Sequence, residues 1–137
     1  AAAAPLDGRM STAAAYLSVA AGGALGATLR FALSGAALRA FGAGFPWGTL
    51  LANVLGGFAM GLAAGALIER GPPAWANLAP FLMTGLLGGF TTFSAFSLDA
   101  LTLAERGRGL AAMGYVGASV ALSIAALWAG LAIARSV

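Results

Sequence analysis

The chain contains no cysteine, no histidine and no lysine, and only 8% of its 137 residues are charged. The missing cysteine excludes disulfide bonds and thiol chemistry, and the missing histidine removes the commonest general base and metal ligand. Soluble domains are about one quarter charged, so this composition indicates a membrane protein. The seven basic residues are all arginines set singly along the chain, a pattern that is not typical of nucleic-acid binding.

Long apolar stretches fill the chain, and 61% of its residues are hydrophobic. A transmembrane helix needs about 20 mostly apolar residues. Four windows meet that length: Ser11 to about Leu38, Ala40 to Ile68, Gly71 to Leu98, and Gly109 to Ala134. The connectors between them are short. We therefore predict an all-α membrane protein, with one four-helix transmembrane domain over residues 11–137, and no soluble module.

The residues before Ser11 are expected to lie outside this domain, because residues 1–10 resemble an N-terminal extension or an expression remnant. A cleaved signal peptide is the alternative for the first apolar window. Its apolar core would span 7–15 residues, and the first window continues well past that length. A retained helix is therefore favoured.

The arginines near the two membrane faces are almost balanced. One face is expected to hold Arg9, Arg70 and Arg135, and the other Arg39, Arg106 and Arg108, with Arg30 leaning toward the second. The positive-inside rule then gives little preference for either orientation. The simple interpretation is that a weak bias decides. The sharper hypothesis is that the chain inserts both ways and forms an antiparallel, dual-topology homodimer.

The third window contains an unusual segment, Gly88 to Ser97, with two glycines, two threonines and two serines among phenylalanines. In hydrocarbon, each unpaired N–H or C=O costs several kcal/mol, so irregular backbone survives only inside protein or beside a wet cavity. We predict a third helix broken near its middle, with an unwound turn at Gly88-Gly89. Carbonyls freed there could coordinate a small cation, as broken helices in transporters do with Na⁺.

Polar stripes recur at four-residue spacing in the other helices. Asn53 follows Thr49 in the second window, and it is either structural glue between helices or a pore amide that offers its NH₂ to an anion. Tyr115, Ser119 and Ser123 form a line in the fourth. The serines either bond back to i−4 carbonyls or line a pathway, and the second interpretation is favoured.

Two further features carry both a packing and a functional interpretation. Phe93 and Phe96 are i, i+3 neighbours, usually a packing pattern, but the interleaved hydroxyls favour a pathway. Arg30 lies inside the first window, where it either snorkels to an interface or contacts a substrate. No carboxylate lies in mid-span. Hydroxyls, an amide and positive phenyl edges suit a small anion and cannot easily exchange protons.

Three segments together resemble the fluoride-channel family called Fluc or CrcB over nearly the whole chain from about Ser11. They are Gly22 to Arg30, Pro46 to Leu50 with Asn53, and Gly88 to Ser97, and the Tyr115, Ser119 and Ser123 spacing also matches. The resemblance implies a passive fluoride channel of the cytoplasmic (inner) membrane. It also implies a dual-topology homodimer with two antiparallel fluoride pathways and a Na⁺ ion at the dimer centre.

The resemblance further implies a role for individual residues. Gly88 and Thr91 would lend backbone carbonyls to Na⁺, and Phe93 and Phe96 would form an aromatic box around fluoride. Asn53 would be the pore amide and Arg30 would lie by the aqueous vestibule. The polar track would consist of Thr49, Ser94, Tyr115, Ser119 and Ser123. Two departures are visible: Ala95 where such proteins often have Thr, and Asp99 where Glu is frequent.

Two other classes of protein fit less well. A small multidrug or guanidinium exporter has a similar size, but it needs a glutamate in its first helix to exchange substrate for protons, and this chain has Arg30 there. An intramembrane serine hydrolase would use Ser94 or Ser119 as its nucleophile. Its serine needs an adjacent base, and the sequence has no histidine or lysine to act as one. We therefore expect no enzyme activity.

Overall fold

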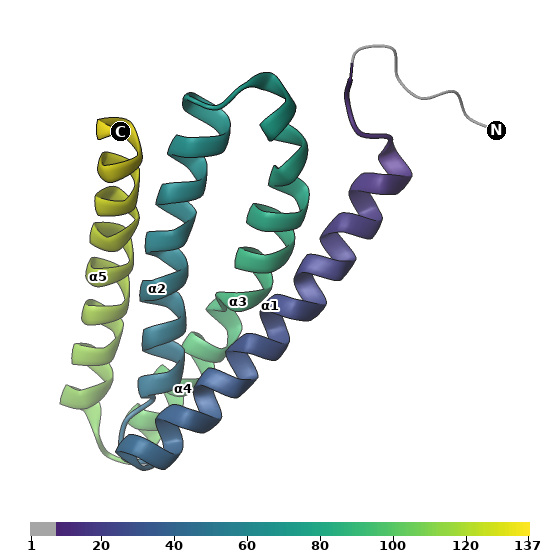
Figure 1. The fold of residues 1–137 in the computed structure, drawn as a ribbon. Coiled ribbons are helices and arrows are strands. Elements are labelled where there is room, and N and C mark those ends of the chain that lie inside the picture. Colours follow the sequence, from purple (N-terminus) through teal and green to yellow (C-terminus); the bar gives the residue numbers. More distant parts are fainter. Residues whose placement is uncertain (1–7) are drawn as a thin grey trace.

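The computed structural model describes residues 8–137, and every regular element in that range is helical (Figure 1). The expected N-terminal extension falls mostly outside the described residues. The elements in chain order are α1 (Thr12–Phe41), α2 (Trp47–Ala63), η1 (Ala64–Glu69), η2 (Pro73–Leu78), η3 (Pro80–Leu87), α3 (Gly88–Phe90), α4 (Phe93–Glu105) and α5 (Gly109–Ser136). Of these, η1 and η3 have π-helical hydrogen bonding and η2 is a 3₁₀ helix.

These elements combine into four helical stretches that are long and apolar enough to span a membrane, as the sequence predicted. They are Thr12–Phe41, Trp47–Glu69, Pro73–Glu105 and Gly109–Ser136. The third stretch ends seven residues beyond the predicted Leu98, so Asp99 lies within α4. The described N-terminal part and the C-terminus lie at the same end of the bundle, with the α1–α2 and α4–α5 connections at the other (Figure 1).

The third stretch is broken, but the break lies later than the sequence predicted. Gly88 has helical angles (φ −63°, ψ −38°), so the prediction of an unwound turn at Gly88-Gly89 is wrong. The extended residues are Thr91 (ψ 156°) and Thr92 (ψ 126°). The Thr92 hydroxyl accepts a hydrogen bond from the amide of Ala95 at 3.2 Å and so caps the start of α4.

The glycines of these helices allow close packing and do not form the break. The contact of α1 with η3 and α3 shows this. A Cβ at Gly22 or Gly26 would overlap the carbonyl oxygen of Phe81 or Leu86, and a Cβ at Gly89 would lie 2.7 Å from the carbonyl of Gly23. Only glycine allows backbones this close. The close approach of α1 therefore explains why position 89 is a glycine within a helical segment.

The contact of α2 with α5 is built in the same way. A Cβ at Gly57 would lie 2.8 Å from the Ser123 carbonyl oxygen, and a Cβ at Gly61 would overlap that of Leu127. In return, a Cβ on Gly130 of α5 would overlap the Phe58 carbonyl of α2. Gly57, Gly61 and Gly65 recur at four-residue spacing in the second window, and this stripe forms the packing seam against α5. We call these two contacts, α1 with η3–α3 and α2 with α5, the glycine seams.

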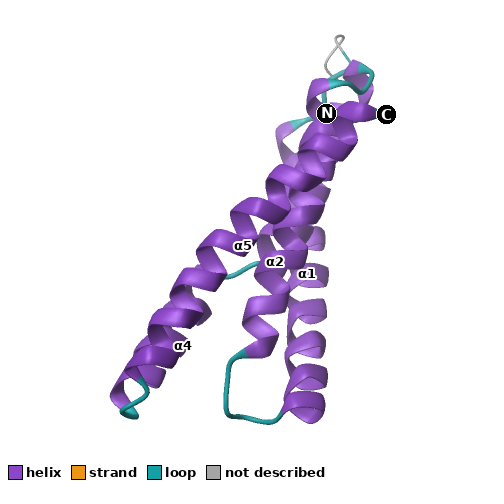
Figure 2. Cartoon of the chain, turned by 90° about the vertical axis from the view of Figure 1, so that its left-hand side faces the viewer, coloured by secondary structure: helices purple, strands orange, loops and turns teal. Residues whose placement is uncertain are grey.

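The bundle opens toward the end that carries the α1–α2 and α4–α5 connections. Figure 2 shows α4 leaning away from α1 and α2 at that end, beyond the break. The Thr91–Thr92 break lets the chain change direction between η3, which packs on α1, and α4, which packs on α5. The space between α4 and the α1–α2 connection becomes the first of two cavities described below.

Candidate functional site

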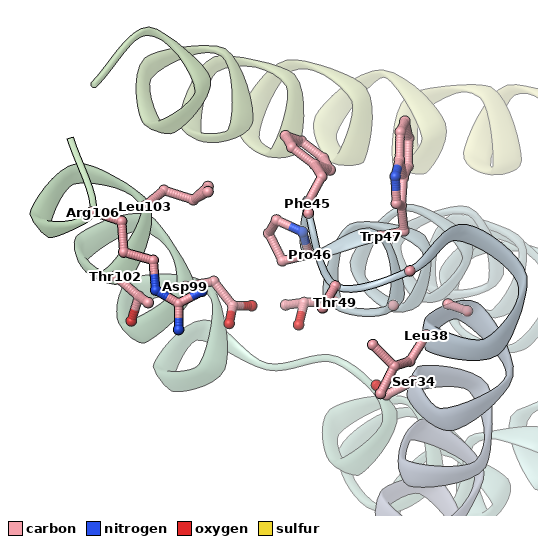
Figure 3. A pocket seen from close by; sticks show the side chains of 15 residues that line it. Ser34, Leu38, Phe45, Pro46, Trp47, Thr49, Asp99, Thr102, Leu103 and Arg106 are labelled. Carbon is pink, nitrogen blue, oxygen red and sulfur yellow. The ribbon is translucent and has the colours of Figure 1, made fainter. Parts of the chain in front are cut away.

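The first cavity lies between α4 and the α1–α2 connection and has a volume of about 270 Å³. We call it the vestibule cavity. Its polar side chains are Ser34 of α1, Thr49 of α2, Asp99 and Thr102 of α4, and Arg106, the C-cap residue just after α4 (Figure 3). In Figure 3, the Asp99 carboxylate and the Thr49 hydroxyl face each other across the space. The sequence prediction had included Thr49 but neither Asp99 nor Arg106.

The second cavity is an open groove of about 440 Å³ on the side of the bundle where the third stretch breaks. We call it the central groove. It brings together Asn53 and Met60 of α2, Thr91 and Thr92 of the break, Phe93 and Phe96 of α4, and Ser119, Ser123 and Leu127 of α5, among others. Five of the residues predicted for an anion pathway therefore meet here: Asn53, Phe93, Phe96, Ser119 and Ser123. No residue that lines this groove is charged.

The two groove serines have hydroxyls without partners. The Oγ atoms of Ser119 and Ser123 are both buried, and no described residue forms a hydrogen bond with either. A buried hydroxyl without a partner costs about 1–3 kcal/mol. The alternative interpretation, in which these serines bond back to i−4 carbonyls, is not what the structure shows. Both donors remain available to a molecule in the groove.

Aromatic rings connect the groove with the vestibule cavity. The rings of Phe93 and Phe96 have centroids 5.4 Å apart, and Phe96 lies 5.4 Å from Tyr115. Tyr115 is fully buried, and its hydroxyl donates a hydrogen bond to Asp99 at 3.2 Å. Phe93, by contrast, is 79% exposed. The row of rings thus begins on an open surface and ends at a buried phenol beside the vestibule cavity.

Asn53 holds the break in place. Its Nδ2 donates to the Thr92 carbonyl at 3.0 Å, and its Oδ1 accepts from the Thr92 amide at 2.8 Å. These bonds fit the interpretation of Asn53 as glue between helices. An asparagine amide has two N–H donors, however, and only one is used by Thr92. The second donor belongs to a side chain that lines the groove, so the pore-amide interpretation is compatible with the same geometry.

The break leaves two backbone carbonyls without their helical donors. The Thr92 amide, which would bond the Gly88 carbonyl in a continuous helix, donates to Asn53. The Ala95 amide, the corresponding donor for the Thr91 carbonyl, donates to the Thr92 hydroxyl. Carbonyls freed in this way are the ligands that broken transmembrane helices offer to Na⁺. The described residues contain no cluster of acidic side chains that could hold a metal ion instead.

Four predicted residues do not line either cavity: Tyr115, which lies between them, and Arg30, Ser94 and Gly88. The Nε of Arg30 donates to the Gly89 carbonyl at 3.1 Å, so this arginine joins α1 to α3. Ser94 is exposed at the start of α4, and its hydroxyl lies 3.3 Å from that of Thr92. Gly88 is exposed beside the break. The structure therefore separates these positions from the lining of either cavity.

Sequence reasoning missed two features of the site. Thr92, a threonine just before a helical pattern, is a recognisable N-cap signal, and it could have placed the break correctly. Asp99 and Arg106 could not be found in this way. They share a cavity with Thr49 only because α4 leans away from α2, and no local pattern encodes that direction (Figure 3).

Comparison with known proteins gives one consistent result. Residues 17–131 match the family described as "CrcB-like protein, Camphor Resistance (CrcB)". A protein of Cereibacter sphaeroides (strain ATCC 17029 / ATH 2.4.9), named fluoride-specific ion channel FluC, is 55% identical over 119 residues, which cover 87% of this chain and 93% of that protein. Proteins of the same name from Rhizobium etli and Paracoccus denitrificans are each 54% identical over 120 residues, covering 88% of this chain and 95% and 94% of theirs.

The family match extends from α1 into the last turns of α5, so it includes both cavities and the break between them. The relatives are covered almost from end to end, so the similarity concerns whole proteins and not a shared module. This multi-pass membrane chain, with four candidate spans and a broken third helix, belongs to the CrcB family.

Proposed function

We propose that this protein is a passive fluoride channel of the cell membrane. The observation that carries the proposal is the central groove, where the unpartnered hydroxyls of Ser119 and Ser123 face the same space as the rings of Phe93 and Phe96. Hydroxyl hydrogens and phenyl edges both carry positive partial charge. The lining contains no group that titrates, and it therefore favours a small anion over a proton-coupled substrate. The names of the relatives point to the same ion.

Fluoride is small and strongly hydrated, so a channel must replace its water with good donors. The buried hydroxyls replace part of that shell without any competing internal hydrogen bond. Narrow walls of phenyl rings then select by size, because a larger halide could not approach the donors as closely. Ions would pass the aromatic row of Phe93, Phe96 and Tyr115 between the groove and the vestibule cavity, where Thr49 continues the polar track. Flow is downhill, and a negative cell interior would drive fluoride outward.

We further propose that the channel works as an antiparallel homodimer. Phe93 is 79% exposed and the central groove is open along one side, so the pathway of a single chain is incomplete. The three arginines Arg9, Arg70 and Arg135 lie at one end of the bundle, and Arg39, Arg106 and Arg108 lie at the other. This balance supports insertion in both orientations. Membrane lipid would cover the remaining apolar surface.

The freed carbonyls of Gly88 and Thr91 would hold a structural Na⁺ at the centre of that dimer. Hard cations are held by several oxygen ligands at once, and two carbonyls from one chain are too few. Two chains related by a twofold axis would supply four. The ion would satisfy backbone oxygens that the break leaves without donors, and so would stabilise the break itself.

The proton-coupled exporter remains the second candidate for a four-helix protein of this size, and no observation favours it. Its transport needs a carboxylate in mid-membrane. Across the described part of α1, the charged residues are Arg30 and Arg39, and the groove lining has no acid. Ser119, one of the two serines considered as a nucleophile, likewise has no base hydrogen-bonded to it among the described residues.

Fluoride efflux from liposomes tests the proposed function. Purified protein in vesicles loaded with potassium fluoride should release the ion within seconds of adding a potassium ionophore, as read by a fluoride electrode. Vesicles loaded with potassium chloride are the matched control and should release almost none. Equal release of both halides, or release of neither, would contradict the proposal.

Orientation is tested separately in cells. The chain has no cysteine, so Ala43→Cys in the exposed α1–α2 connection introduces a unique thiol. A membrane-impermeant maleimide should label about half of the protein from outside, and the rest only after permeabilisation. Complete labelling, or none, before permeabilisation would exclude dual topology.

A further inference from the structure

The vestibule cavity is lined by two charged side chains, and the one bonded to the polar track, Asp99, is negative. Asp99 lines this cavity and accepts the hydrogen bond of the buried Tyr115 hydroxyl at 3.2 Å. That bond fixes the carboxylate beside the row of aromatic rings. An anion that arrives in the cavity on its way to these rings therefore meets a negative charge, which would lower its local concentration.

Arg106 is the basic residue in the lining of the same cavity. It is the C-cap residue that follows α4, and Figure 3 shows it on the same side of the cavity as Asp99. Its guanidinium has no hydrogen bond or ion pair with any residue of the described chain. Its positive charge is therefore not neutralised by an ion pair with a described residue, and Asp99 is no exception.

The other arginines at this end of the bundle are placed differently. Arg108 donates to the Gly44 carbonyl and ties the α4–α5 connection to the α1–α2 connection. Arg39, in the last turn of α1, is exposed and does not line the cavity. Arg30, the vestibule residue that the family resemblance implies, is bonded to Gly89. Arg106 is thus the arginine positioned to act on an ion inside the cavity.

We propose that Arg106 attracts fluoride into the vestibule cavity and offsets the charge of Asp99, and so sets the rate at which ions reach the aromatic row. The inference rests on the proposed fluoride conduction. A charge in a cavity with low-dielectric walls raises the local concentration of the opposite ion. The effect of a side chain at the mouth of the cavity is screened by salt. Arg106 is therefore a positioning residue for the ion, acting over distance and not by filling the narrow part of the path.

Initial fluoride efflux at low fluoride concentration measures this uptake step. At about 10 mM ionic strength, where the Debye length is about 30 Å, Arg106→Gln should lower the rate about threefold, and Arg106→Glu about tenfold. At about 1 M potassium gluconate, where the Debye length is about 3 Å, both should approach the wild-type rate. Arg106→Lys keeps the charge and should behave as wild type at both salt concentrations.

Two further variants separate charge from structure. Arg39→Gln removes an arginine from the same end of the bundle but not from the cavity, and should leave efflux unchanged. Asp99→Asn combined with Arg106→Gln should recover most of the lost rate, because no uncompensated carboxylate remains. An Arg106→Gln rate equal to wild type at low salt would overturn the inference, as would a loss of the same size at high salt. If the wild-type protein itself released no fluoride, the proposed function would fail instead.

Discussion

The α2–α5 seam and the central groove both use residues of α2 and α5, yet the seam leaves no space for side chains while the groove leaves polar side chains without partners. In the seam, glycines bring backbones together so closely that a single methyl group has no space, as at Gly61 against Leu127. In the groove, one turn away, the Ser119 and Ser123 hydroxyls are buried without a partner. The seam shows what tight packing in a membrane requires, and the groove departs from it where function needs free donors.

This difference predicts that substitutions in the seams act on stability and substitutions in the groove act on ion flux. The predictions below test that division, from the largest expected effect to the smallest. The division is supported if seam variants lower stability and groove variants lower ion flux. It is contradicted if a groove variant acts through stability or a seam variant lowers flux without loss of stability.

The largest effect is expected in the glycine seams. Gly26→Ala and Gly61→Ala each place a methyl group onto a backbone carbonyl, of Leu86 and Leu127 respectively. Backbone cannot yield as a flexible side chain can, so each change should destabilise the fold by about 3 kcal/mol or more. Thermal unfolding of purified protein in detergent measures this. Gly23→Ala on the same face of α1 has its nearest neighbour at 4.0 Å and should be tolerated; equal instability in all three would contradict the seam.

Loss of the groove rings should abolish most ion flux while the fold survives. Phe93→Ile and Phe96→Ile remove phenyl edges but keep an apolar side chain. A ring contact is worth up to about 1.5 kcal/mol, so fluoride efflux should fall about tenfold. Size-exclusion profiles should match wild type, because Phe93 is 79% exposed in the single chain and Phe96 keeps aliphatic bulk. Unchanged efflux would count against a role for ring edges.

Asn53 combines a structural role with a place in the groove, since it binds the Thr91–Thr92 break and also lines the groove. Asn53→Asp keeps the acceptor for the Thr92 amide but places a negative charge beside the ion path, and efflux should be lost. Asn53→Ala removes both bonds without adding charge, and should lower efflux only partly while lowering the unfolding temperature. If both variants lost efflux equally, the amide would act by holding the break and not by facing the ion.

Substitution of the two groove serines should have a smaller effect on efflux, and should not lower stability. Ser119→Ala and Ser123→Ala remove hydroxyls that have no partner among the described residues. Stability should stay the same or rise, because an unsatisfied buried group is lost. Efflux should fall about fivefold for each, as one hydrogen bond to the ion is worth about 1 kcal/mol. A fall in stability would show that these hydroxyls have structural partners.

The smallest effect is expected on the exposed surface at the end of the bundle, away from the groove. Glu69 at the end of η1 forms a double hydrogen bond with Arg135, at 2.7 and 2.8 Å, on the exposed surface. Exposed ion pairs contribute little because water and salt screen them. Glu69→Gln should therefore leave both the unfolding temperature and fluoride efflux within error of wild type. A clear change in efflux would extend the functional region to the far end of the bundle.

The sequence predicted the four helices because their apolar windows are long and their connectors are short. The glycine seams followed from four-residue spacing, and the composition of the groove followed from polar residues in otherwise apolar helices. The position of the break did not, because Gly88 and Gly89 read as helix breakers while their actual neighbour is α1. Local propensity cannot show that an approaching backbone requires a glycine.

The vestibule cavity lay beyond sequence reasoning for a different reason. Its charges, Asp99 and Arg106, belong to a helix whose direction depends on the extended backbone of Thr91 and Thr92. A small change in those dihedral angles would carry α4 elsewhere and leave no cavity.

Anion selectivity in a planar bilayer tests the central claim most directly. The uncharged lining of hydroxyls and ring edges should dehydrate fluoride and exclude chloride. With equal concentrations of sodium fluoride on one side and sodium chloride on the other, the reversal potential should approach the value set by fluoride alone. A reversal potential near zero, with chloride carrying as much current as fluoride, would contradict the account.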